Sequence, residues 1–196
     1  MEIVIGTNNI DKLAEYRRML EPLGFKCLSL KDENINCDPE ETGDTFQENS
    51  MIKALEIAKY TNKIVIADDS GLVINSLPDI LGVKSKRFLN EDSTYDERNA
   101  KIIEMLEGKD RSAYFFCCIT LTNYKGKTLQ FDGIINGNIG YEIIGDKGFG
   151  YDPIFIPNGY DVTLAQVSEN HKNSISHRGN ASRLLVEYLK NNSRLK

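Results

Sequence analysis

Short apolar runs and helical patterns alternate from the first residues of the chain, and this alternation restricts the possible folds more than any other feature. Residues 3–5 form an apolar run typical of a buried strand, and residues 10–20 place apolar side chains at roughly helical spacing. A second strand-like run follows at residues 26–30, after the helix-ending sequence PLGF. A strand, a helix and another strand in this order indicate a βαβ unit.

The same mixture of elements continues through the middle of the chain. The polar and acidic segment 31–44 is typical of a loop. Thr45, with Glu48 three residues later, forms a capping-box pattern that predicts the start of a helix. The apolar run Ile64–Ala67 predicts the next strand, and two acidic residues follow it directly.

The second half of the chain adds a hairpin to this pattern. A helix is expected from about Ser93 to Leu106, with Ser93 and Asp96 as its N-terminal caps. Two long strands follow, and the turn near Lys125–Gly126 between them predicts a hairpin. A last helix is expected within the final 20 residues. The predicted fold class is therefore α/β, with a single domain over residues 1–196.

Charge and composition argue against several classes of partner. The net charge is −5, whereas tight binding to nucleic-acid polymers requires a broad basic surface. No apolar stretch is long enough to span a bilayer, and the N-terminal sequence MEIVIGTNN lacks the basic region of a signal peptide. The four cysteines form no C-x-x-C pair and are expected to be reduced core residues. We therefore expect a cytoplasmic protein that binds neither membranes nor nucleic acid.

Two adjacent carboxylates, Asp68 and Asp69, are the strongest candidates for a functional site. They follow a buried strand directly, and ligands of open α/β sheets bind beyond the carboxyl ends of strands. Neighbouring acids repel each other and lose hydration on burial, so a hard cation such as Mg²⁺ would stabilise the pair. The alternative is a turn in which Asp68 is a cap and Asp69 lies in solvent. The acidic run that contains Glu40 and Glu41 is either part of such a site or a solvated surface.

The turn sequence GTNNIDK has the composition of an anion-binding site. It places Thr7, Asn8, Asn9 and Lys12 between a strand and a helix. Free N–H groups and the positive end of the helix dipole at such a turn favour phosphate, and Lys12 could reach the same anion. The P-loop pattern is absent. The alternative is a polar turn with a surface lysine.

Two later segments carry side chains suited to a nucleoside. In GFGYDPIF, two glycines permit close approach of the backbone, and Phe149 and Tyr151 offer flat rings on which a base can stack. In ENHKNSISHRGNA, Lys172, His177 and Arg178 supply donors that could bind carbonyl or phosphate oxygens. The alternatives are a loop with core aromatic residues and a basic surface turn.

Taken together, these motifs resemble the inosine triphosphate pyrophosphatase family, the RdgB-like noncanonical purine NTP pyrophosphatases. The matching segments occur in the family's order across nearly the whole chain: GTNNIDK, EETGDTFQENSMIKA, IADDSGL, GFGYDPIF and SHRGNA. The resemblance implies an elongated α/β fold, with a long central mixed sheet flanked by helices and an active-site cleft between two lobes. It also implies a homodimer that hydrolyses ITP, dITP and XTP to the monophosphate and pyrophosphate with Mg²⁺.

The resemblance further implies roles for individual residues. Asp69 is the expected catalytic carboxylate and a metal ligand, Glu40 is the expected second metal ligand, and Asp68 is expected to support the site. Residues of the phosphate-binding turn and of the later motifs are expected to bind the substrate. They are Thr7, Asn8, Asn9, Lys12, Ser70, Phe149, Gly150, Tyr151, Asp152, Lys172, His177 and Arg178.

The sequence departs from the family's pattern at two places. Asn8 stands where the family commonly has glycine, and PDILGVKSKRF matches the family's PG-x-x-SAR segment only loosely, with Lys86 in place of alanine. Two other functions stay open: a pyrophosphatase that prefers pyrimidine or other modified triphosphates, and a non-catalytic nucleotide-binding module. The combination of Asp69, Glu40 and Lys12 favours an enzyme, because binding alone does not require a carboxylate placed for water.

Overall fold

The structure is a computed structural model, and it describes residues 1–90 and 92–193. Contacts between residues divide the chain into two compact units. The first unit consists of residues 1–69, 117–133 and 177–196, and the second consists of residues 70–116 and 134–176. Each unit is therefore built from segments that are distant in the sequence.

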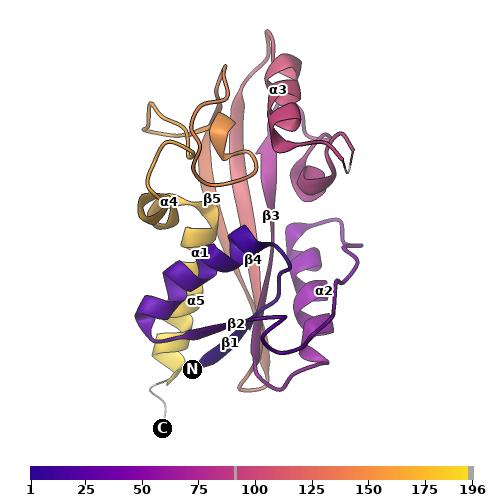
Figure 1. The fold of residues 1–196 in the computed structure, drawn as a ribbon, viewed down its shortest axis with the longest axis vertical. Coiled ribbons are helices and arrows are strands. Elements are labelled where there is room, and N and C mark those ends of the chain that lie inside the picture. The colour runs from indigo at the N-terminus through magenta and orange to yellow at the C-terminus, as the bar shows by residue number, and fades with distance from the viewer. Residues whose placement is uncertain (91, 194–196) are drawn as a thin grey trace. The chain divides into compact units, whose positions relative to one another are not determined.

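Helices and strands alternate along the chain, as the sequence predicts for an α/β protein (Figure 1). The elements in chain order are β1 Glu2–Ile5, α1 Ile10–Leu20, η1 Glu21–Leu23, β2 Lys26–Ser29, α2 Phe46–Ala58, β3 Ile64–Ile74, η2 Gly82–Arg87, α3 Tyr95–Met105, β4 Ser112–Tyr124, β5 Lys127–Ile139, η3 Asp152–Ile154, β6 Phe155–Pro157, α4 Glu169–Ile175 and α5 His177–Ser193.

The strands form one sheet in the order β2-β1-β3-β4-β5-β6. β1 is parallel to both β2 and β3, with Ile3 opposite Cys27 and Ile64, so the predicted βαβ unit is confirmed. β6 is antiparallel to β5, which makes the sheet mixed, as the resemblance implies. Lys125 and Gly126 join β4 to β5 with positive φ angles of 52° and 70°. This is the backbone of a tight hairpin turn, so the predicted hairpin is confirmed.

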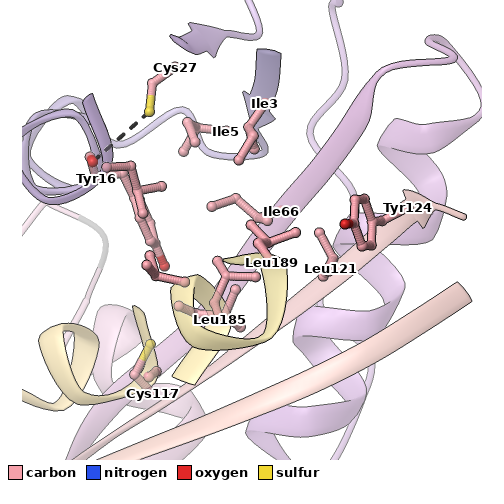
Figure 2. Close-up of a cluster of buried hydrophobic side chains, with 14 residues drawn as sticks. Ile3, Ile5, Tyr16, Cys27, Ile66, Cys117, Leu121, Tyr124, Leu185 and Leu189 are labelled. Atoms are coloured by element: carbon pink, nitrogen blue, oxygen red, sulfur yellow. Dashed lines mark hydrogen bonds between the residues drawn. The ribbon is translucent and has the colours of Figure 1, made fainter. Parts of the chain in front are cut away.

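In the first unit, alternate strand residues pack against helices on opposite faces of the sheet. Ile3 and Ile66 belong to a cluster with side chains of α1 and α5, shown in Figure 2. Val4 and Val65, one residue out of phase, pack instead with Ile57 of α2. α1 and α5 therefore cover one face, and α2 covers the other (Figure 1).

The second unit has a hydrophobic core of its own. This core joins Leu72 of β3 and Phe115 of β4 to Ile102 of α3 and Phe155 of β6. The rings of Phe115 and Phe155 are tilted against each other, with their centroids 4.7 Å apart. The core fixes α3 against the sheet, and α3 supplies side chains to the site described below.

One predicted helix boundary is confirmed and another is wrong by one residue. α2 begins at the capping box that the sequence predicts. α3 begins with a capping box formed by Thr94 and Glu97, rather than by Ser93 and Asp96. Thr94 Oγ1 accepts the N–H of Glu97 at 3.2 Å, and the hydroxyl of Ser93, one residue earlier, donates to the side-chain oxygen of Asn90 at 2.8 Å.

β3 extends further than the sequence predicts. Its apolar run ends at Ala67, but the strand runs from Ile64 to Ile74, so Asp68 and Asp69 lie within it rather than beyond its end. Both acids are buried, with exposed fractions of 3% and 5%. The prediction of a strand that ends before the acids is therefore wrong, because cations from distant segments neutralise the two carboxylates inside the fold.

Two smaller features bear on the class of protein. Cys27, Cys117 and Cys118 are free and buried, as expected for core cysteines, and Cys37 is free and partly buried. Among the described residues, the helices are all too short or too polar to cross a membrane.

Candidate active site

The two acids of β3 belong to different clusters because neighbouring strand residues point to opposite faces of a sheet. Asp68 is in phase with Ile66, which faces α1 and α5, and Asp69 is in phase with Val65, which faces α2. The two carboxylates therefore form ion pairs with different lysines within the first unit, Asp68 with Lys12 and Asp69 with Lys53. In the sequence the two acids are adjacent, whereas in the fold their side chains lie on opposite faces of the sheet.

Asp68 is the centre of a buried ion-pair network. Its Oδ2 accepts hydrogen bonds from Lys12 Nζ at 2.9 Å and from Arg178 Nη2 at 3.2 Å. Arg178 also donates from Nη1 to Glu15 Oε2 at 2.5 Å. α1 supplies Lys12 and Glu15 three residues apart, on one helix face, and α5 supplies Arg178. The network therefore fastens α1 and α5 to the strand that carries the acids.

The surrounding cations decide the ionisation of Asp68. Burial alone would raise the pKa of this carboxyl, but Lys12, Arg178 and Lys53 outweigh burial and hold the pKa well below its usual range. Burial would likewise lower the pKa of Arg178, but Asp68 and Glu15 raise it well above its ordinary value. Asp68 therefore stays ionised at every physiological pH. Its Oδ1 is buried and has no hydrogen-bond partner among the described residues.

Asp69 lies in a second cluster, formed with α2. Lys53 Nζ donates to Asp69 Oδ1 at 3.2 Å and to Glu41 Oε1 at 2.9 Å, so one ammonium group joins two carboxylates. Asn49 Nδ2 donates to Asp69 Oδ2 at 3.3 Å. Asn49 and Lys53 are four residues apart and therefore share one face of α2.

The balance of charge at Asp69 is the reverse of that at Asp68. Burial raises the pKa of Asp69, Lys53 opposes this rise, and the negative charge of Glu41 adds to it, so the pKa lies above its ordinary value of 3.8. Burial would lower the pKa of Lys53, but Asp69, Asp68 and Glu41 together raise it. Lys53 therefore remains a cation, and Asp69 is the more basic of the two acids. A carboxylate of raised pKa is better suited to accept a proton.

Asn49 also fixes the loop that precedes α2. Its Oδ1 accepts a hydrogen bond from the backbone N–H of Gly43 at 2.8 Å. A Cβ atom at Gly43 would lie 2.5 Å from Glu48 Cβ and 2.9 Å from Asn49 Oδ1, so only glycine fits there. The loop that carries Glu41 is thereby held at a defined distance from Asp69.

The expected metal ligands are Asp69 and Glu40, but the structure brings Glu41 to Asp69. Glu40 is exposed, whereas Glu41 is half-buried and shares Lys53 with Asp69. The described residues contain no group of three or more His, Cys, Asp or Glu side chains arranged to hold a metal ion. Mg²⁺ is commonly held by one or two carboxylates together with substrate phosphates, so the oxygen donors of Asp69 and Glu41 suit it chemically.

The turn before α1 is held by its own side chains. Asn9 is the N-cap of α1, and its Oδ1 accepts hydrogen bonds from the N–H groups of Asp11 and Lys12. Thr7 Oγ1 accepts from the N–H of Asn9 at 3.1 Å. Asn8 Nδ2 donates to Asp38 Oδ1 at 3.2 Å. The expected phosphate-binding turn is therefore an ordered helix start, with Lys12 directed to Asp68.

In the second unit, the segment Phe149–Asp152 is built around one carboxylate. Asp152 Oδ2 accepts hydrogen bonds from the N–H of Phe149 at 2.9 Å and from Lys172 Nζ at 2.6 Å. Lys172 Nζ also lies 4.6 Å from the centroid of the Phe149 ring, within the range of a cation–π interaction. Gly148 has a φ of +71°, and a Cβ atom there would lie 2.2 Å from Asp152 Oδ2.

The two aromatic residues of this segment differ in exposure. Phe149 is half-buried, whereas Tyr151 is only 4% exposed and donates from its hydroxyl to the carbonyl of Ser85 at 2.5 Å. Tyr151 is therefore a core aromatic residue, which is the alternative to base stacking that the sequence left open. Of the two rings, only that of Phe149 is partly exposed to solvent. Ser70 follows Asp69 on β3 and is half-buried.

The basic residues of the last motif make their described contacts in different units. Lys172 pairs with Asp152 in the second unit. His177 and Arg178 begin α5 in the first unit, where both are buried and Arg178 pairs with Glu15 and Asp68. A role of these three residues in binding the substrate stays a prediction.

Sequence reasoning missed three residues of the first unit: Asn49, Lys53 and Glu15. A signal for two of them was present, because the capping box at Thr45 fixes the start of α2 and places Asn49 and Lys53 on one face. For Glu15 the only signal is its position three residues after Lys12, since its partner Arg178 is 163 residues away.

Known proteins with this architecture match nearly the whole chain. The sequence model of the Ham1 family matches residues 3–188. A dITP/XTP pyrophosphatase of an Exiguobacterium species is 42% identical over 186 residues, which are 94% of this chain and 95% of the relative. The dITP/XTP pyrophosphatase of Bacillus subtilis is 39% identical and covers 96% of each chain.

Solved structures agree with these sequence matches. A HAM1 protein from Coxiella burnetii superimposes with a TM-score of 0.87 and 40% identity, over 97% of this chain and 99% of the other. The Ham1 protein of Staphylococcus aureus gives a TM-score of 0.86 and 37% identity, over 98% and 100%. Identity of this level over this length confirms the resemblance inferred from the motifs, and the chain belongs to the Ham1 family.

Proposed function

We propose that the protein hydrolyses noncanonical purine nucleoside triphosphates, namely ITP, dITP and XTP, to the monophosphate and pyrophosphate. One observation carries the proposal: Asp69 is a buried carboxylate of raised pKa, placed beside Lys53 and Glu41. Such a group can accept a proton from water next to fixed positive charge. Relatives named dITP/XTP pyrophosphatase, about 40% identical, supply the class of substrate.

The mechanism follows from the charges of the first unit. A triphosphate is highly anionic, so attack by water is hindered until cations offset its charge. Lys12 and Lys53 are fixed cations that would bind phosphate oxygens. Asp69 would orient the attacking water at the α-phosphorus and accept its proton. Pyrophosphate then leaves from the opposite side of that phosphorus.

We propose Mg²⁺ as the cofactor, held by Asp69 and Glu41. When bound, the ion neutralises phosphate charge and stabilises the oxygens that gain charge during the reaction. Glu41 is preferred over Glu40 because Lys53 joins Glu41 to Asp69, whereas Glu40 is exposed. Glu40, the ligand that the resemblance implies, is the alternative.

Matched substitutions separate these two candidates. We expect Glu41→Gln to raise the Mg²⁺ concentration for half-maximal activity by about tenfold or more, because it removes a charged oxygen ligand. Glu40→Gln should leave that concentration within about twofold of wild type, because Glu40 is exposed. Initial rates measured across a Mg²⁺ titration decide the assignment. A large effect of Glu40→Gln with none of Glu41→Gln would assign the metal to Glu40 instead.

We propose that the base is bound by residues of the second unit. The half-buried ring of Phe149 can stack on a purine. Lys172, fixed by Asp152, is a donor for the 6-keto oxygen that inosine and xanthine carry where adenine has an amino group. Adenine presents a donor at the same position, so the ammonium group of Lys172 would face another donor and adenine would bind less tightly.

A base panel tests the function. With Mg²⁺, the wild-type protein should release pyrophosphate from ITP and XTP, with a kcat/KM at least about a hundredfold above that for ATP. Equal activity on ATP, or no activity on ITP, would refute the proposal. Preference for a pyrimidine triphosphate would establish the first alternative, and saturable binding without pyrophosphate release would establish a non-catalytic module.

Two further proposals follow from the family. We propose that the protein works in the cytoplasm and that its active form is a homodimer. The mass in analytical ultracentrifugation tests the second, since the single chain has a mass of 22.1 kDa. Sedimentation at that mass under assay conditions would contradict a dimer.

A further inference from the structure

The segment Phe149–Asp152 is held by three elements of the second unit. α4 holds it through Lys172 and Asp152, as described above. η2 holds it through Ser85, whose carbonyl accepts the hydroxyl of Tyr151 at 2.5 Å. α3 holds it through Asn99, whose Nδ2 donates to the carbonyl of Gly150 at 3.1 Å. The sequence motifs account for the first of these contacts, and the other two arise only in the folded chain.

Asparagine at position 99 lowers the stability of the folded protein relative to an apolar residue. Its side chain lies in α3 and is fully buried. Its Oδ1 has no hydrogen-bond partner among the described residues, and a buried acceptor without a partner is destabilising. An apolar side chain of similar size would avoid this cost. The contact that an apolar side chain could not reproduce is the hydrogen bond to Gly150.

The backbone at Gly150 needs such support. Gly150 has a φ of +69°, a conformation outside regular helix and strand, between Phe149 and the buried Tyr151. Tyr95, one helical turn before Asn99, packs its ring edge-on against Tyr151 with centroids 5.4 Å apart. One face of α3 therefore holds this segment through an aromatic contact and through a hydrogen bond.

Ser85 extends the same support to β3. Its hydroxyl oxygen accepts the N–H of Leu72 at 3.1 Å and lies 3.2 Å from the carbonyl of Leu72. The carbonyl of Ser85 then accepts Tyr151. Ser85 belongs to the segment PDILGVKSKRF, for which the sequence gives no role. In the structure this segment links the strand to the aromatic residue beside Gly150.

We propose that Asn99 is a positioning residue for the segment Phe149–Asp152. By fixing the carbonyl of Gly150, it sets the orientation of the Phe149 ring and so the affinity and selectivity for the base. This inference rests on the proposed function, because it assigns base binding to the segment. Asn99 acts through this segment and contacts neither the base nor the phosphates.

The test compares Asn99→Leu with Asn75→Leu. Asn75 also lies in the second unit and donates from its amide, but to the exposed hydroxyl of Ser112. We expect Asn99→Leu to raise KM for ITP by about 3- to 10-fold, the worth of one hydrogen bond. Its kcat should stay within about twofold, its preference for ITP over ATP should fall, and its thermal midpoint should not decrease. Asn75→Leu should leave KM and the base preference unchanged.

A second variant guards against a folding defect. Tyr151→Phe removes the hydrogen bond to Ser85 and keeps the ring, and it should change KM and base preference in the same direction as Asn99→Leu. If Asn99→Leu lacks the wild-type circular dichroism spectrum, the smaller Asn99→Ala, which also removes the amide donor, decides in its place. Unchanged KM and base preference in a folded variant, with an active wild type, overturn this inference. An inactive wild type overturns the proposed function instead.

Discussion

Asp69→Asn is expected to lower kcat for ITP by about 100- to 10,000-fold, the usual contribution of a general base. Asparagine keeps the size of the side chain and can still accept from Lys53 through its one amide oxygen, while it loses the hydrogen bond from Asn49. It cannot accept a proton from water. Binding of ITP, measured by calorimetry with the inactive variant, should therefore remain close to that of the wild type.

The pH dependence of the wild type provides a second measure of the same role. Turnover requires ionised Asp69, and burial raises the pKa of this group above 3.8. In the metal-free protein the Asp69 carboxyl should therefore titrate at a higher pH than an ordinary aspartate, as followed by carbon-13 NMR, and bound Mg²⁺ should lower that pKa. Asp32→Asn, at an exposed position paired with Arg17, is the control and should keep full activity. Retained turnover in Asp69→Asn would remove Asp69 from the mechanism.

Arg178→Met is expected to destabilise the protein by about 3–5 kcal/mol, because it removes the guanidinium that two buried carboxylates share. Arg178, Glu15 and Asp68 have side chains that are 2%, 6% and 1% exposed. Lys12 still pairs with Asp68 in the variant, but Glu15 loses its ion pair with Arg178. Urea unfolding measures the loss. Arg17→Met, which removes an exposed pair, should cost less than about 1 kcal/mol.

The destabilisation of Arg178→Met should shrink as the pH falls. In the variant, Glu15 lacks the guanidinium that stabilises its ionised form, so the folded variant takes up a proton on this carboxylate more readily than the folded wild type does. Uptake of that proton favours the folded variant, so the difference in unfolding free energy between the variant and the wild type becomes smaller. A loss below about 1 kcal/mol at neutral pH would show that the network does not hold α1 and α5 to β3.

The local elements of the fold were predictable because their signals are local. The apolar runs at residues 3–5 and 64–67 predicted β1 and the start of β3, and the capping box at Thr45 predicted the start of α2. Lys125–Gly126 predicted the hairpin, because glycine readily adopts the positive φ that a two-residue turn requires. Each of these features depends on residues within one element.

The extension of β3 was not predictable from its own residues. Two adjacent acids normally end a buried strand, but Lys12 and Arg178, 56 and 110 residues away in the sequence, neutralise Asp68. Lys53 compensates Asp69 from α2. Only the folded chain brings these cations to the strand. Once the strand continues through the acids, strand alternation requires the two side chains to point to opposite faces.

The choice between Glu40 and Glu41 shows a different limit. Both belong to a loop without periodicity, so the sequence carries no signal for which side chain turns inward. Asn49 and Gly43 fix that loop from α2 and direct Glu41 to Lys53. Motif matching identifies the acidic segment, but only the hydrogen bonds of the folded loop show that Glu41, rather than Glu40, lies beside Asp69.

Hydrolysis of ITP in oxygen-18 water tests the central claim most directly. That claim is that the cluster around Asp69 directs water to the α-phosphorus and that pyrophosphate is the leaving group. Mass spectrometry of the products should then find one labelled oxygen in the phosphate of IMP and none in pyrophosphate. Label in pyrophosphate, or orthophosphate and IDP as the products, would contradict the mechanism.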